Sequence, residues 1–302
     1  MIRARLKAVL VALSVLIACA ACSTAAAVPS GGLPPTLRVG VIPNISPETQ
    51  RAQYEPFREY LAERLKTKVE LFVATNYAGV VAALAARKLD VAYLGGLTYV
   101  QAEAQTKVTP LVTEVDQETG TPQYLSAVVA RKDSAFTSTK DVVAAGAKFA
   151  FGDVSSTSGS LYPRIMLTDA GARCQKGDLT SCAPLSAVTF TGGHDATAQA
   201  VLSGSADAGG IEIRILHRLE KQGSVPKGAL RVLETRKVMG YPWVAAPDLD
   251  QSARGAIVKA FTEMSDPKLL DLMRAKRYVA VSATDYTEVR ERAAALGLLT
   301  AP

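Results

Sequence analysis

The chain has 302 residues, of which 48% are hydrophobic and 6% aromatic, and a formal net charge of +6. These proportions are normal for a globular protein, and the length is enough for two modest domains. Arg3, Arg5 and Lys7 supply half of the excess positive charge, and the later charges alternate in sign along predicted helix faces, as in residues 55–64. This pattern indicates a solvated surface and excludes a polyanion-binding groove, so we expect no nucleic-acid partner.

The first 22 residues have the pattern of an export signal, with basic residues, an uncharged run and small residues before a cysteine. They resemble a bacterial lipoprotein signal, in which the lipidated residue would be Cys19 or, as a second choice, Cys22. The alternative is an ordinary secretory signal with unmodified cysteines. The resemblance implies an exported protein that is lipid-anchored to the cell membrane and faces the periplasm or the cell exterior. Residues 23–35, rich in Ser, Ala, Gly and Pro, are expected to form a flexible tether.

Two cysteines, Cys174 and Cys182, lie in the remaining chain and bracket a polar segment rich in turn residues. Because disulfides persist outside the cytoplasm, we expect a bridge that closes this loop. Two cysteines without a nearby His, Asp or Glu constellation make a poor zinc ligand set, so we expect neither a metal nor a cofactor.

After the tether, short β-branched runs alternate with longer helical patterns. We expect strands at 37–42, 69–73 and 91–94, each followed by a helix. This βαβ rhythm predicts a mostly parallel sheet covered on both faces, with ligands at the carboxyl ends of its strands.

A second set of elements follows residues 124–131. We expect strands at 149–151, 187–190, 206–209 and 243–245, and helices at 139–145, 159–171, 195–203, 212–221, 252–264, 267–274 and 285–296. The whole pattern predicts two α/β lobes that are joined by two crossings. The first lobe would comprise residues 36–128 plus 236–302, and the second lobe residues 129–235, with a hinge between them.

The segment from Phe151 to Ser160 ends an apolar run and packs glycine and small hydroxyl residues together before a helical pattern. A strand that turns into a helix through Ser-Thr-Ser-Gly directs backbone N–H groups and hydroxyls at one point. That point suits an oxyanion. Ordinary helix capping is the alternative.

Several motifs resemble, in order and spacing, the phosphate/phosphite/phosphonate-binding proteins of ABC importers: residues 76–81, 90–100, 151–159, 193–196 and 206–209. The likeness extends from about residue 37 to 299, and residues 155–160 and 286–299 are most similar to a branch labelled selenate-binding. It implies a type II periplasmic-binding-protein fold with two lobes that close on a small anion. It also implies a monomer that delivers the anion to a membrane permease.

The resemblance implies site residues by motif register. In aminophosphonate-binding relatives two tyrosines, the Ser-Thr-Ser run and a histidine hold the phosphonate. The corresponding residues here are Tyr77, Tyr124, Ser156, Thr157, Ser158 and His194. From the residues alone, Tyr77 could simply pack its ring, Tyr124 could belong to a hinge, and His194 could begin a capped helix.

The same relatives place two carboxylates around the ligand's ammonium group, and by register Arg214 and Tyr241 stand at these positions. A pocket that lost both acids would not compensate a buried cation, so an aminoalkyl phosphonate is disfavoured. We expect phosphite, phosphate, selenate, sulfate or a very small phosphonate. Arg214 would add charge-assisted donors, and Glu212 could accept from a protonated ligand.

Two further residues belong to the expected site. Tyr93 lies in a predicted buried strand, where a core role competes with ligand binding. Gly95 ends that strand, where the missing side chain allows backbone to approach a ligand or to turn sharply.

Two other functions are compatible with parts of the sequence. Ser158, His194 and Asp195 invite comparison with a serine hydrolase, but Ser-Thr-Ser-Gly is not the Gly-x-Ser-x-Gly elbow, and sequence neighbours at a helix start cannot easily orient each other. We therefore expect no enzyme. A sensor subunit that signals to a membrane kinase could use the same fold and pocket, and the sequence does not separate it from a transport component.

Overall fold

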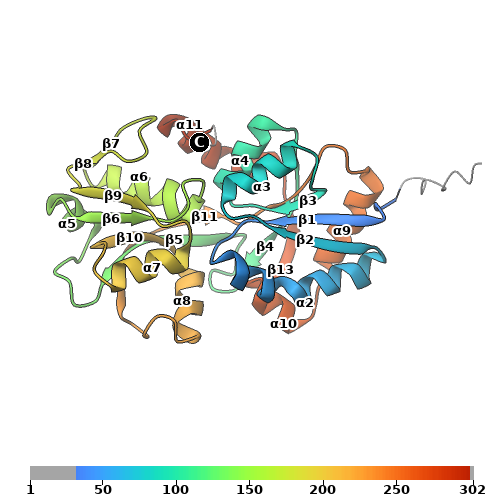
Figure 1. The fold of residues 1–302 in the computed structure, drawn as a ribbon, viewed down its shortest axis with the longest axis horizontal. Coiled ribbons are helices and arrows are strands. Elements are labelled where there is room, and N and C mark those ends of the chain that lie inside the picture. Colours follow the sequence, from blue (N-terminus) through green and yellow to red (C-terminus); the bar gives the residue numbers. More distant parts are fainter. Residues whose placement is uncertain (1–31, 300–302) are drawn as a thin grey trace, which may run out of the picture.

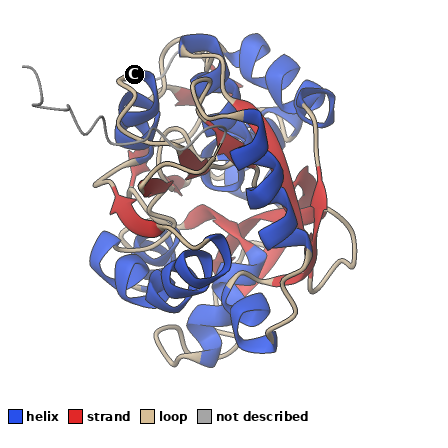
Figure 2. Cartoon of the chain, turned by 90° about the vertical axis from the view of Figure 1, so that its right-hand side faces the viewer, coloured by secondary structure: helices blue, strands red, loops and turns tan. Residues whose placement is uncertain are grey.

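The computed structural model describes residues 32–299. The expected signal peptide, both candidate lipidation sites Cys19 and Cys22, and most of the tether lie outside the described residues. Two sheets stand side by side along the long axis of the molecule, each between helices (Figures 1 and 2). Among the described residues, no helix is both long and apolar enough to span a membrane.

The first sheet has six strands in the order β13-β4-β12-β3-β1-β2. Its strands are β1 (Thr36–Val41), β2 (Lys68–Val73), β3 (Val91–Tyr93), β4 (Thr109–Asp116), β12 (Trp243–Ala245) and β13 (Ala275–Ala280). The helices of this part of the chain are α2 (Pro47–Leu65), α3 (Tyr77–Ala85), α4 (Gly96–Gln105), α9 (Gln251–Thr262), α10 (Pro267–Leu272) and α11 (Thr287–Leu296), with a 3₁₀ turn η2 (Ala283–Tyr286).

The second sheet has five strands in the order β11-β5-β10-β6-β9. Its strands are β5 (Gln123–Arg131), β6 (Lys148–Phe151), β9 (Ala187–Phe190), β10 (Ala208–Glu212) and β11 (Leu230–Met239). The helices here are α5 (Thr139–Ala144), the π-helical turn η1 (Thr157–Leu161), α6 (Tyr162–Asp169), α7 (His194–Leu202) and α8 (Ile213–Lys221). A small hairpin of β7 (Arg173–Cys174) and β8 (Cys182–Ala183) carries the expected disulfide between Cys174 and Cys182.

The two-lobed α/β class is confirmed, but the strand pairing in each sheet is mixed where we expected mostly parallel sheets. Strands β2, β1 and β3 are parallel, as are β10, β6 and β9, whereas β4, β5, β11, β12 and β13 pair antiparallel. Strands β4 and β5, and likewise β11 and β12, are consecutive in the chain but belong to different sheets, so the chain passes directly from one sheet to the other at these two points. The predicted lobe boundaries at residues 128 and 235 fall inside β5 and β11 and stay a prediction.

A large hydrophobic core lies around the first sheet, where Phe57, Trp243 and Phe261 pack with ring centroids 4.8–5.7 Å apart. Leu161 and Tyr162, at the end of η1 and the start of α6, belong to this same cluster. Two smaller clusters line the second sheet. The second lobe therefore packs directly on the first around η1.

Four strands end at the junction of the lobes, and each has a polar residue or a glycine at its last position or shortly after it. Asn44 follows β1, Gly95 follows β3, Asp153 follows β6, and Glu212 is the last residue of β10. Because the carboxyl ends of parallel strands form the usual ligand crevice of α/β sheets, this edge is the place to look for a site.

Candidate functional site: a buried ring of hydrogen-bond donors between the lobes

The Ser-Thr-Ser-Gly turn forms the N-terminus of η1 and is held by its own hydrogen bonds. The Ser156 hydroxyl caps the turn by accepting from the Gly159 backbone N–H (2.9 Å), and Ser126 of β5 donates to the Ser158 carbonyl (2.9 Å). The capping interpretation therefore holds for Ser156. The Ser158 hydroxyl is fully buried and has no hydrogen-bond partner among residues 32–299, which leaves it free for a ligand.

Thr157 connects the two lobes. Its hydroxyl accepts from the Leu97 backbone N–H at the start of α4 (2.8 Å), and Thr98 donates to the Ser155 carbonyl (2.9 Å). A Cβ atom on Gly95 would lie 2.9 Å from the Thr157 hydroxyl oxygen. The missing side chain of Gly95 thus allows a close approach. We expected a ligand to approach here, and in this structure the neighbour is Thr157 of the other lobe.

His194 begins α7 and is positioned by both lobes. Its backbone N–H donates to the Asn44 carbonyl (2.9 Å), and its Nδ1 accepts from the Glu212 backbone N–H (3.3 Å). Burial is the main reason why the pKa of His194 falls to about 4. The positive charges of Arg214 and Arg274 lower this pKa further, whereas the negative charge of Glu212 raises it. The neutral ring therefore carries its proton on Nε2, and this N–H has no partner in the described part of the chain.

Three of the four expected tyrosines form a row of phenols beside His194. Tyr77 donates to the Asn44 side-chain oxygen (2.7 Å), and Tyr241 donates to Glu212 Oε2 (2.5 Å). The Tyr124 hydroxyl is buried without a hydrogen-bond partner within residues 32–299. Burial raises the pKa of Tyr124, and the Ser158 side chain acts in the opposite direction, so these two hydroxyls lie close together. The fourth tyrosine stands behind this row.

That fourth residue, Tyr93, stacks its ring on Tyr241 with centroids 5.1 Å apart, and its hydroxyl accepts a long hydrogen bond from Arg274 (3.4 Å). Its ring also packs on Trp243 (4.9 Å). Tyr93 therefore supports the phenol row from behind in this structure.

Arg214 differs most from the sequence-based expectation. Its guanidinium contacts Glu212 (2.7 Å), Glu114 (3.1 Å) and Asp116 (3.1 Å), all of which are almost fully buried, and Arg274 lies 3.5 Å from Glu212. Burial alone would raise the pKa of Glu212, but Arg214 and Arg274 outweigh it and lower that pKa to about 2. In this structure Arg214 is thus neutralised by three carboxylates.

The same cluster corrects the expectation that both acids are missing from the pocket. Glu212 is a fully buried carboxylate at the site, beside Tyr241, although register counting had placed Arg214 there. Both Glu212 oxygens already accept, one from Tyr241 and one from Arg214, so Glu212 is engaged by the protein itself.

All the expected ligand residues lie at this one junction, but sequence analysis missed several of their partners. The missed residues are Asn44, Glu114, Asp116, Asp153 and Arg274. Asn44 and Asp153 could have been found, because each directly follows a predicted parallel strand. Asp153 accepts from the backbone N–H groups of Tyr77 (3.1 Å) and Ser155 (2.8 Å), which ties the start of α3 to the serine turn.

The hydrolase alternative finds no support in the side-chain geometry. Asp195 accepts from the backbone N–H groups of Ser46 (3.1 Å) and Ala196 (2.9 Å), whereas His194 Nδ1 accepts from a backbone N–H. A histidine whose Nδ1 is an acceptor cannot be oriented by a carboxylate at that atom.

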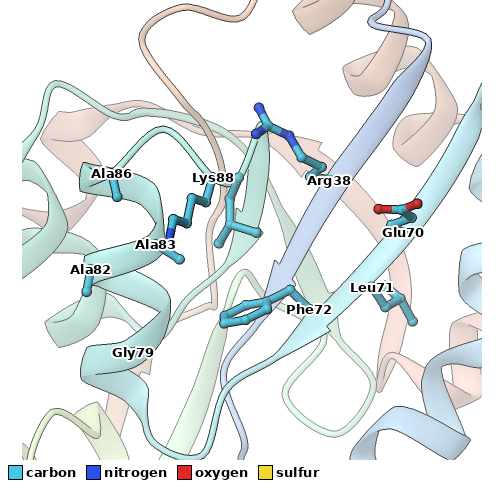
Figure 3. Close-up of a pocket in the computed structure, with 10 residues that line it drawn as sticks. Arg38, Glu70, Leu71, Phe72, Gly79, Ala82, Ala83, Ala86 and Lys88 are labelled. Carbon is cyan, nitrogen blue, oxygen red and sulfur yellow. The ribbon is translucent and has the colours of Figure 1, made fainter.

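A different hollow lies on the outer side of the first lobe, between α3 and the edge strand β2 (Figure 3). It has a volume of about 540 Å³, and Ala82, Ala83, Ala86 and the 41% exposed Phe72 are among its lining residues. None of the expected ligand residues is among the described residues that line it. Its charged lining residues are Arg38, Glu70 and Lys88.

Comparison with known proteins agrees with the geometry. Residues 39–286 match the family described as ABC transporter, phosphonate, periplasmic substrate-binding protein. A phosphate-import protein of Mycolicibacterium smegmatis is 32% identical over 276 residues, covering 86% of this chain and 85% of that protein. A probable ABC transporter phosphite-binding protein of Prochlorococcus marinus is 26% identical over 274 residues, covering 85% and 89%.

A solved structure from Prochlorococcus marinus, in complex with methylphosphonate, superposes with a TM-score of 0.76 at 25% identity and covers 88% of this chain and 100% of that chain. The family match spans residues 39–286, and the M. smegmatis relative covers 86% of the chain. The chain therefore belongs to the family of periplasmic substrate-binding proteins of ABC phosphonate transporters.

Proposed function

We propose that this protein captures a small phosphorus oxyanion, of the phosphite, phosphate or methylphosphonate type, by closure of its two lobes. It then delivers the anion to an ABC permease. The observation that carries the proposal is the set of buried donors without protein partners in the described chain: the hydroxyls of Ser158 and Tyr124, Nε2 of His194 and the Asn44 amide nitrogen. Buried donors are normally satisfied, so donors that meet between two lobes point to a ligand.

The names of the similar proteins support the same ligand class. They name phosphate import, phosphite binding and a methylphosphonate complex. The family consists of substrate-binding transport proteins and not of enzymes. A ligand that contacts Ser158 and His194 of the second lobe and Asn44 of the first favours the closed form over the open one, which is the physical basis of hinge closure.

Lipid anchoring through Cys19 or Cys22, and a monomeric state, belong to the proposal as well. A cysteine-linked lipid would keep the protein at the membrane face where the permease stands. Labelling of cells with a radioactive fatty acid, followed by purification of the wild-type protein and of Cys19→Ser and Cys22→Ser variants, identifies the acylated cysteine. If both variants keep the label of the wild-type protein, or if the wild-type protein takes up none, the proposed lipid anchor is contradicted.

Calorimetric titration of the purified protein with phosphite, phosphate, methylphosphonate and 2-aminoethylphosphonate tests the ligand class. Ser158→Ala, Tyr124→Phe and His194→Ala should each weaken binding by roughly ten- to a hundredfold, because each removes a donor to a charged ligand. His217→Ala is a matched control, since this second histidine is exposed and pairs with Glu118. Unchanged affinity in all three site variants would overturn the proposed site.

A transport role predicts that deletion of the gene abolishes uptake of the bound anion. Uptake that is unaffected by the deletion, together with intact binding, would favour a sensing role instead.

A further inference from the structure

A small cavity next to the ligand pocket is built by both lobes. It lies between α2 of the first lobe and α8 of the second, and Figure 1 shows both helices on the lower side of the molecule. Its volume is about 20 Å³, which is room for one particle the size of a water molecule. Four of its lining residues are Asn44, Tyr54, Arg218 and Arg274.

Three buried side chains of this lining have a polar atom without a hydrogen-bond partner in the described part of the chain. These atoms are Tyr54 Oη, Asn44 Nδ2 and Arg274 Nε, and the three residues are at most 6% exposed. The two nitrogens can only donate, and burial raises the pKa of Tyr54, so its hydroxyl keeps a proton to donate. Because buried donors are normally satisfied, we expect the cavity to hold an acceptor.

The charged groups that line the cavity are both positive. Arg218 and Arg274 contribute a guanidinium each, and no carboxylate is among the described residues of the lining. Glu212 lies 3.5 Å from Arg274 without a hydrogen bond to its Nε, and it contacts Arg214 more closely (2.7 Å). This one carboxylate is therefore shared by two guanidiniums.

Arg218 is the less compensated of the two lining cations. Its guanidinium donates to the main-chain carbonyls of Leu272 (2.9 Å) and Asp271 (2.5 Å) and forms no ion pair within residues 32–299. Burial lowers the pKa of Arg218 and the charge of Arg274 lowers it further, and the opposing charges of Asp271 and Glu212 do not restore it. The surroundings of the cavity therefore favour a negative guest over a neutral one.

A neighbouring cavity shares these two arginines but differs in its other charges. It has a volume of about 140 Å³, and Glu118 and Asp271 are among its lining residues. Acids of its own lining offset the arginines there, so that cavity does not need an additional anion.

We propose that the small cavity is a second anion site, which binds a halide ion such as chloride and thereby helps to hold the two lobes together. Tyr54 and Asn44 donate hydrogen bonds to the ion, and Arg218 and Arg274 balance its charge. A single water molecule would fit the volume, but it would have to donate two hydrogens in a lining whose unpartnered atoms are donors. A tetrahedral oxyanion is too large for a cavity of about 20 Å³.

The ion links closure of the lobes to ligand binding. Arg218 stands on α8 of the second lobe, whereas Tyr54 on α2 and Asn44 after β1 belong to the first. An ion that contacts both lobes binds better when they are together, and the oxyanion ligand has the same preference. Each should therefore raise the affinity for the other by the same factor. The anion site itself does not depend on the proposed function, whereas its coupling to oxyanion binding rests on it.

Calorimetric titration with phosphite tests the coupling, with sodium chloride replaced stepwise by sodium gluconate at constant ionic strength. The phosphite affinity should rise about fivefold as chloride increases from none to about 150 mM, which is the lower end of usual coupling between sites. An affinity that does not depend on chloride would refute the coupling. An affinity that falls with chloride would also refute it, because chloride would then compete in the oxyanion pocket.

Tyr54→Phe tests the cavity as the place where chloride acts. Loss of one hydroxyl donor should weaken chloride binding by about ten- to a hundredfold, so the gain from chloride should fall below about twofold. Tyr60→Phe is a matched control on the same helix, because its hydroxyl donates to the Ala260 carbonyl (2.6 Å), and it should keep the full gain. Arg218→Met is the second variant, should Tyr54→Phe fold poorly, and it should lose the gain as well. A gain equal to that of the wild type in a folded cavity variant would overturn the site.

Crystals grown with sodium bromide test the site without any oxyanion. Bromide scatters X-rays anomalously, and we expect it within hydrogen-bond distance of Tyr54 Oη and Asn44 Nδ2. A cavity filled by water in these crystals would overturn the anion site. If bromide occupies the cavity while no phosphorus oxyanion binds to the protein, the proposed function fails and the anion site stands, so the two failures are distinguishable.

Discussion

Replacement of Arg214 by methionine tests the ion cluster that joins the two lobes. Arg214 stands on α8, which follows the second sheet, whereas Glu114 and Asp116 belong to β4 of the first sheet, both 3.1 Å from its guanidinium. The substitution keeps the length and the apolar stem of the side chain but removes its charge. It leaves three buried carboxylates with Arg274 as their remaining close cation, through Glu212.

The magnitude follows from the burial of this cluster. Breaking a buried ion pair by removing one partner costs about 3–5 kcal/mol. When the lobes separate, the stranded carboxylates can regain water, so the closed form is penalised relative to the open one. Taking the lower value, about 3 kcal/mol, the affinity for every ligand should fall by about a hundredfold.

Titration calorimetry of Arg214→Met with phosphite and methylphosphonate measures this loss. Both ligands should weaken by the same factor, because Arg214 acts on closure and not on a particular ligand. Arg64→Met is the control, since Arg64 pairs with Glu263 at the surface with both side chains more than 40% exposed, and such pairs contribute at most about 1 kcal/mol. A loss below about fivefold, or clearly different factors for the two ligands, would refute the reasoning.

Three further changes have definite expected outcomes. Gly95→Ala places a Cβ 2.9 Å from the Thr157 hydroxyl and should weaken ligand binding by about tenfold in calorimetry, whereas Gly255→Ala, which meets open space, should not. Replacing both cysteines of the β7–β8 hairpin with serine should lower the free energy of unfolding by about 2–3 kcal/mol in urea melts, because the bridge closes a short loop, with ligand affinity retained. The depressed pKa of His194, about 4 against 6.5, means that the unfolded chain binds a proton before the folded one does. The contribution of His194 to the free energy of unfolding is therefore fully present above about pH 6.5, and it falls by about 3 kcal/mol as the pH drops to 4. The variant His194→Gln should show a weaker pH dependence of the free energy of unfolding in urea melts over this range.

The sequence predicted the elements well where hydrophobic periodicity was strong. The strands at 187–190 and 243–245 agree residue for residue with β9 and β12, and the helix at 139–145 agrees with α5 to within one residue. The mixed pairing could not be predicted from the βαβ rhythm, because it depends on β4, β5, β11 and β13, and a strand's direction in a sheet is a tertiary property.

The sequence predicted which residues meet at this junction but not how their charges are paired. Ser158, Tyr124 and His194 follow recognisable motifs, and they lie together as buried groups without protein partners in the described chain. The pairing of Arg214 with Glu114 and Asp116 joins residues about a hundred positions apart, and no local pattern marks it. Arg214 therefore looked like a free cation in the sequence.

A crystal structure of the protein grown with phosphite is the most direct test of capture between the lobes. We expect the anion within hydrogen-bond distance of Ser158 Oγ, Tyr124 Oη and His194 Nε2, with Arg214 still on its three carboxylates. Phosphite bound at another place, with these three groups satisfied by water or by one another, would contradict the proposed binding site.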